Sequence, residues 1–163
     1  MHRSLAARQR AAQSLLAATL LLAPLLAARP AHGVSLADKK GLAEEALRWA
    51  IGGGFPEAAA LQQDEPIVVS NYGLSRSLTL EVPGRKVVLA SFAKIQAAAD
   101  ITGSAAYFVV GPFNDNGGRV EVGLTFATAV SSRGHGTASK VQATLTFERR
   151  SGAWHLLPDV QRP

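Results

Sequence analysis

Apolar and polar residues alternate along the C-terminal third of the chain. Between residues 120 and 126, and again between 141 and 147, every second residue is apolar, with polar or small residues between them. Successive side chains of a β-strand point to opposite faces of the sheet, so this period of two predicts strands with one buried face. We expect two further strands over residues 107–113 and 153–157. The connections between these segments are short and rich in Gly, Asn and Ser, which predicts an antiparallel meander.

Helical spacing replaces the alternation near residue 40. Apolar residues recur there at intervals of three and four, at Leu42, Ala46, Trp49 and Ala50. This spacing places them on one face of a helix. Ser35 is its expected N-cap, with Asp38 as the acid of a capping box. Glycines 52–54 are expected to end the helix, because glycine tolerates the left-handed geometry of a helix terminus.

A second helix is predicted over residues 92–100, with Ser91 as its N-cap and Gly103 at its end. A short helix is predicted over 55–62, and compact apolar strands over 66–70 and 86–90. Leu78, Leu80 and Val82 alternate ahead of Pro83-Gly84, a pair that suits a type II turn.

The fold class that follows is α+β. One face of the meander is apolar and needs a cover, and the two helices are the only candidates for it. We therefore predict an N-terminal helix and a second helix packed on one side of a curved antiparallel sheet. Residues 34–163 are long enough to bury a core as a single domain.

Residues 1–33 have the three parts of a secretory signal peptide. Three arginines precede a 15-residue apolar run, Ser14 to Ala28, which is shorter than a membrane span and contains Pro24. Ala31 and Gly33 supply small residues at positions −3 and −1, which predicts cleavage between Gly33 and Val34. Ala-rich, Arg-rich composition suggests a bacterial source. We expect a protein of the periplasm or the extracellular space, with no stable membrane insertion after cleavage.

The net charge of +5 resides mostly in this leader. Residues 34–163 carry 13 basic and 12 acidic side chains, because four of the 17 Lys and Arg precede Val34 and no acid does. A nucleic-acid partner therefore loses its main support. The absence of cysteine excludes disulfides, thiolate metal sites and a cysteine nucleophile. No metal-ligand spacing, P-loop or dinucleotide fingerprint is present, so we expect no metal and no cofactor.

The N-terminal helix followed by a meander that closes in Gly152-Ala153-Trp154 resembles the cystatin-like α+β roll of the nuclear-transport-factor-2-like superfamily, over residues 36–158. The segment 66–130 also resembles uncharacterised exported bacterial proteins. The superfamily includes isomerases, dehydratases, scaffolds and ligand-binding modules. The resemblance therefore implies a fold and leaves the function open.

Six residues are candidates for chemistry. His135 lies in a glycine-flanked polar loop near Arg133, where it suits either anion or proton chemistry or an exposed hairpin tip. Tyr72, Tyr107 and Asp100 would serve an enzyme if they converged in an apolar cup; otherwise they are sheet packing and a helix end. Ser91-x-x-Lys94 matches a nucleophile spacing but lacks that family's other motifs, and an N-cap serine with a surface lysine explains it equally well.

The leading hypothesis is a non-enzymatic exported domain that binds a small apolar ligand or a partner protein. A small isomerase or hydro-lyase of the same fold is one alternative. Another alternative is an envelope interaction module that acts through a sheet face or an edge strand. Such a module could also form a homodimer.

Cleavage of the leader gives the first test. N-terminal sequencing of the exported protein is expected to begin at Val34. A sequence beginning at Met1 would contradict the cleavage prediction.

Overall fold

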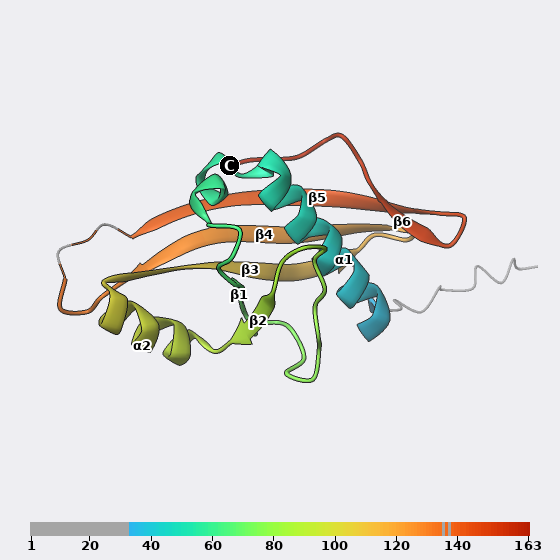
Figure 1. Cartoon of the computed structure of the whole chain (residues 1–163). Helices are drawn as coiled ribbons and strands as arrows, with labels where there is room; N and C mark the ends of the chain where they lie inside the picture. The colour runs from blue at the N-terminus through green and yellow to red at the C-terminus, as the bar shows by residue number, and fades with distance from the viewer. Residues whose placement is uncertain (1–32, 135, 137) are drawn as a thin grey trace, which may run out of the picture. The chain divides into compact units, whose positions relative to one another are not determined.

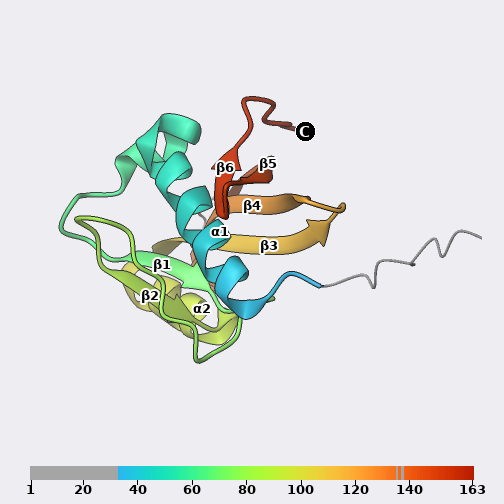
Figure 2. The same cartoon turned by 90° about the vertical axis from the view of Figure 1, so that its right-hand side faces the viewer.

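A six-stranded sheet curls around one helix in the computed structural model (Figures 1 and 2). The structure describes residues 33–163 except 135 and 137, within the compact unit spanning 31–163. The predicted leader and His135 therefore lie outside the described residues, apart from Gly33 at the leader's end. The strand order is β2-β1-β3-β4-β5-β6.

The last four strands form the antiparallel series that the alternation predicted. They are β3 (Ser104–Asp115), β4 (Arg119–Val130), β5 (Ser139–Arg150) and β6 (Ala153–Leu156). Each pairs antiparallel with its sequence neighbour. We call the face that carries Phe108, Leu124 and Leu145 the inner face and the opposite one the outer face. On β6, Trp154 packs against the core and His155 is exposed.

The first two strands correct the prediction of an entirely antiparallel sheet. β1 (Ile67–Ser70) pairs in parallel with β2 (Val87–Ala90) and with β3. Parallel neighbours need a crossover connection of about a dozen residues or more. Segments 71–86 and 91–103 both meet that length. The six-stranded sheet is therefore mixed, and the α+β class itself is confirmed.

These two crossovers run in opposite directions along the sheet. The step from β1 to β2 goes to the sheet's edge, and the step from β2 to β3 returns past β1. Crossovers between parallel strands are right-handed in nearly all proteins, so two that run in opposite directions lie on opposite faces. Segment 71–86 accordingly covers the inner face, where it buries Leu74, Leu78, Leu80 and Val82.

The returning crossover is α2 (Phe92–Thr102), and it lies on the outer face. Its first residue, Phe92, meets the Tyr107 ring at 5.8 Å between centroids. Tyr107 alternates with buried Phe108, so the two side chains point to opposite faces of β3. The prediction that both helices cover the apolar face is therefore wrong. Segment 71–86 takes the place that was assigned to α2.

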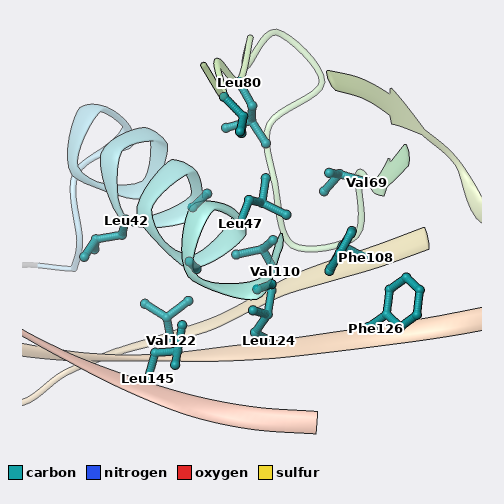
Figure 3. Close-up of a cluster of buried hydrophobic side chains, with 14 of the residues drawn as sticks. Leu42, Leu47, Val69, Leu80, Phe108, Val110, Val122, Leu124, Phe126 and Leu145 are labelled. Atoms are coloured by element: carbon teal, nitrogen blue, oxygen red, sulfur yellow. The ribbon is translucent and has the colours of Figure 1, made fainter. Parts of the chain in front are cut away.

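α1 (Leu36–Trp49) is the other cover of the inner face. Its buried residues are Leu42, Ala43, Ala46 and Leu47. Side chains from α1, the sheet and segment 71–86 converge on one cluster (Figure 3). Phe108 and Phe147 are fully buried within it, and truncating such a side chain to alanine typically costs about 3–5 kcal/mol.

Asp38 joins the start of α1 to the far end of the chain. The Asp38 amide donates to Ser35 Oγ at 3.1 Å, as a capped helix requires, and Ser35 Oγ donates to Asp38 Oδ2 at 2.7 Å. Trp154 Nε1 donates to the other carboxylate oxygen at 2.8 Å. The Ser35 and Trp154 hydrogen bonds hold the pKa of Asp38 below its ordinary value of 3.8. This carboxylate therefore fixes the β5–β6 hairpin against the helix.

The glycines after α1 end it as predicted, and Gly54 has a second role. Gly53 adopts a φ of 108°, and Gly54 lies buried under the Trp49 ring. Arg162 then donates from Nη2 to the Gly54 carbonyl at 2.7 Å and lies over Trp49. Gly54 and Trp49 thus anchor the C-terminal segment.

Gly54→Ala tests this packing. A Cβ at this position would lie 2.6 Å from Trp49 Cε2, closer than atoms can approach. We expect a loss of about 1–3 kcal/mol in the free energy of unfolding, measured by urea denaturation. Gly52→Ala is the matched control, because nothing lies within 4 Å of its Cβ position. Equal stabilities for the two variants would contradict the account.

Candidate functional site

A hollow of about 310 Å³ lies where β1 and β2 end. It is lined by Asn71, Arg76, Leu89, Ser91 and Lys94, and we call it the switch-point hollow. Asn71 directly follows β1, and Ser91 directly follows β2. The Asn71 amide donates to the Ala90 carbonyl at 2.9 Å, which holds the two strand ends together.

The position of this hollow follows from the topology. At the carboxyl ends of β1 and β2 the chain leaves toward opposite faces, inward along segment 71–86 and outward along α2 (Figure 2). Where neighbouring parallel strands part in this way, the connections leave a crevice between them, and α/β proteins commonly bind ligands there. The parallel pairing that the sequence pattern did not predict is thus what creates the site.

The charge in the hollow is positive. Arg76 and Lys94 line it, and no carboxylate does. Among the described residues, no hydrogen bond or ion pair engages either cationic group. Other cations on the surface are engaged; for example, Arg48 pairs with Glu45, and Arg119 with Glu148. The hollow is therefore suited to an anionic group.

Three aromatic rings adjoin the hollow, and we call Tyr72, Phe92 and Tyr107 the aromatic cluster. Phe92 lies between the other two, with centroid distances of 6.0 Å to Tyr72 and 5.8 Å to Tyr107. Tyr72 is 70% exposed and Phe92 45% exposed. Each directly follows a residue that lines the hollow. Cationic groups and aromatic rings therefore both lie near the carboxyl ends of β1 and β2.

Ser91 and Lys94 both line the hollow. Of the two roles considered for Ser91, the structure shows that of the N-cap of α2. Ser91 Oγ accepts a hydrogen bond from the Lys94 amide at 3.4 Å and caps α2. A nucleophilic serine needs a base within hydrogen-bond reach of its hydroxyl. In the described part of the chain, no side chain hydrogen-bonds to Ser91. Among the described residues, Ser91 therefore has a helix-capping role, and Arg76 and Lys94 leave the hollow suited to an anion.

Asp100 and Tyr107, two further candidates that the structure describes, have different neighbours. Asp100 Oδ1 accepts from the Ser132 amide at 2.7 Å, from Ser132 Oγ at 3.0 Å and from Gln96 Nε2 at 3.2 Å. These bonds, the Ser132 amide first, hold the pKa of Asp100 below its ordinary value of 3.8. Tyr107 belongs to the aromatic cluster. The structure does not bring the two together through a shared partner.

A larger hollow, of about 540 Å³ beside α1, carries charges of both signs: it is lined by Glu44, Arg48, Glu81, Arg85 and Lys86. Glu44 pairs with Lys40 at 3.4 Å and Arg48 with Glu45, while Arg85 donates to two backbone carbonyls. Arg85 Nε is nevertheless buried without a hydrogen-bond partner, and no ion pair engages Lys86 among the described residues.

Sequence reasoning missed Arg76, because no motif surrounds it. The usable signal was positional. Arg76 and Lys94 both follow shortly after compact apolar strands, where the ends of parallel strands would gather the residues that come next.

Comparison of the chain with protein-family models, curated proteins and solved structures finds no match. The superfamily resemblance therefore stays a prediction. Within the described residues no helix is long and apolar enough to cross a membrane. The same residues hold no cluster of three or more groups suited to a metal ion.

Replacing Asp100 tests its structural role. Asp100→Ala removes the acceptor for the Ser132 amide, so exchange of that amide with solvent is expected to accelerate about tenfold. Hydrogen-exchange NMR measures this, with Asp115→Ala as the control, because Asp115 bonds only its own turn at Gly117.

The stabilising contribution of Asp100 is expected to decrease in acid. Because the pKa of Asp100 is lowered on folding, its stabilising contribution is complete above pH 3.8 and is lost as the pH falls through the lower, folded-state value. Thermal unfolding of the wild type and of Asp100→Ala should therefore differ at neutral pH and converge in acid. A difference that widens in acid would contradict this role.

Proposed function

We propose that this protein is an exported, non-enzymatic binding domain that engages a partner protein through the switch-point hollow and the aromatic cluster. Its place of action is the periplasm or the extracellular space, after loss of the leader. The roll-like superfamily resemblance is retained as part of this proposal.

The exposure of the aromatic cluster carries the proposal. Large aromatic side chains dominate the binding energy of protein interfaces, whereas exposed rings in contact with water gain nothing for folding. The side chains of Tyr72 and Phe92 are exposed to solvent, Tyr72 just after β1 and Phe92 at the start of α2. Their rings are held by mutual contact, which reduces the entropy lost on binding.

A partner protein is favoured over a small apolar ligand by where the apolar surface lies. A small ligand typically buries most of its surface in an enclosed pocket. The inner face, where an apolar cup would open, is packed with Leu47 of α1 and Leu80 of segment 71–86. The apolar groups available for contact are on the outside, around Phe92.

Binding is favoured over catalysis by the polarity of the core. An isomerase or hydro-lyase of this architecture needs an ionisable group inside an apolar site. Among the described residues the buried polar side chains are Ser70 and Ser131, and neither ionises. Asp100 is exposed and holds Ser132.

Site-specific photocrosslinking tests the proposal. A benzoylphenylalanine introduced at Phe92 in the producing cell is expected to yield one discrete adduct with an envelope protein. That adduct should be lost when the chain also carries Tyr72→Ala, because the aromatic cluster is then broken. Ile101 is the control position, since it lies on the same helix and is 86% exposed.

Three outcomes would contradict the proposal. The first is no adduct from Phe92, and the second is the same set of adducts from Phe92 and Ile101. The third is a bound small molecule, detected by native mass spectrometry of the purified protein, that Tyr72→Ala releases.

A further inference from the structure

The free edge of β2 adjoins both parts of the proposed interface. β2 is the end strand of the sheet and pairs on one side with β1. An end strand presents unpaired backbone groups, which an extended segment of another protein can use to add a strand. Val88 of β2 is 36% exposed on the outer face, and Leu89 next to it lines the hollow. Side chains of an added strand would therefore meet the hollow and the outer face alternately.

The charged residues nearest to β2 in the sequence are all basic. Lys86 precedes β2, and Arg76 and Lys94 lie in the hollow beyond its end. Between residues 66 and 99 the only acidic residue is Glu81, which Lys40 binds at 3.2 Å. Asp64 and Glu65 come just before this range, at the Lys86 end of the edge, where Arg85 donates to the Glu65 carbonyl at 3.2 Å. At the other end no carboxylate lines the hollow, so Arg76 and Lys94 face no acidic group there.

This charge decides between two occupants of the edge. In a symmetric antiparallel pairing of two β2 strands, the Lys86 end of each copy would approach the Lys94 end of the other. Like charges facing each other across paired strands are destabilising. Lysine at an edge is also a common device against self-pairing of sheets. A second copy of this chain is therefore disfavoured, and an acidic strand is favoured.

We propose that the partner supplies an extended segment of alternating acidic and apolar residues, which adds to the free edge of β2. Its carboxylates lie in the switch-point hollow with Arg76 and Lys94. Its apolar side chains lie on the opposite side, against Val88 and Phe92. This inference rests on the proposed function and specifies the chemistry of the partner.

The alternation of acidic and apolar residues in the partner's segment follows from the geometry of a β-strand. Every second side chain of the added strand would point to the hollow, and the side chains between them would point to the outer face. Both cations present donors to an incoming carboxylate, and hydrogen bonds between charged groups are stronger than those between neutral ones. The edge supplies affinity through backbone bonds, and the two faces supply selectivity.

A designed peptide pair tests the inference on the purified protein. The probe is acetyl-Glu-Val-Glu-Val-Glu-amide, and its match is the same peptide with Lys in place of Glu. Titration followed by ¹⁵N NMR should show the acidic peptide shifting the amides of residues 87–91 and 71–76, with no binding of the basic one. Added salt should weaken the binding.

Variants that remove one positive charge test whether the peptide carboxylates bind in the hollow. Arg76→Gln and Lys94→Gln are each expected to weaken the acidic peptide about tenfold, because each removes a charge-assisted contact. Lys140→Gln is the matched control, since Lys140 is an exposed lysine on β5. It should leave the affinity unchanged.

Several results would overturn the inference: equal binding of the two peptides, unchanged affinity in Arg76→Gln and Lys94→Gln, or free glutamate binding as tightly as the peptide. A concentration-dependent dimer in sedimentation whose formation Val88→Lys abolishes would assign the edge to a second copy instead. If the peptide fails while the Phe92 adduct forms, the inference fails alone. If the adduct fails while the peptide binds, the proposed function fails.

Discussion

β1 pairs in parallel with both of its neighbours, and the proposed binding surface depends on this pairing. Parallel pairing requires two crossovers, and their shared handedness places them on opposite faces. Segment 71–86 thereby completes the core over the inner face, and α2 covers part of the outer face. The strand ends between them become a hollow. An antiparallel arrangement of the same strands would join them by short turns and leave no such crevice.

Polar groups in the structure fall into two sets. Groups that hold the fold are bonded to one another: Asp38 with Ser35 and Trp154, Asp100 with Ser132, Arg162 with Gly54. Arg76 and Lys94 at the strand ends take part in no such bond among the described residues, and the aromatic cluster beside them is open to water. The proposed interface is thus defined by available cationic groups and exposed aromatic rings close to one another, rather than by any catalytic motif.

The sequence predicted the elements better than their arrangement. Alternation in β4 and β5 and helical spacing in α1 are local patterns, and Ser35 and Ser91 cap the helices as expected. The direction of β1 beside β2 leaves no such pattern, because a strand of four residues looks alike in either direction. The Trp154–Asp38 bond spans 116 positions of sequence and could not be foreseen from spacing. Arg76 and Lys94 come together because β1 and β2 run parallel, so the positional signal in the sequence could be used only once that direction was known.

The direction of β1 relative to β2 is the most direct test of the account. Interstrand proton contacts in NMR distinguish the two directions, because close Hα–Hα pairs occur across antiparallel strands and Hα–amide pairs across parallel ones. The account predicts Hα–amide contacts between the two strands, in the register that aligns Ile67 with Val87 and Val69 with Leu89. Close Hα–Hα contacts between β1 and β2 would contradict it, and with it the origin of the hollow.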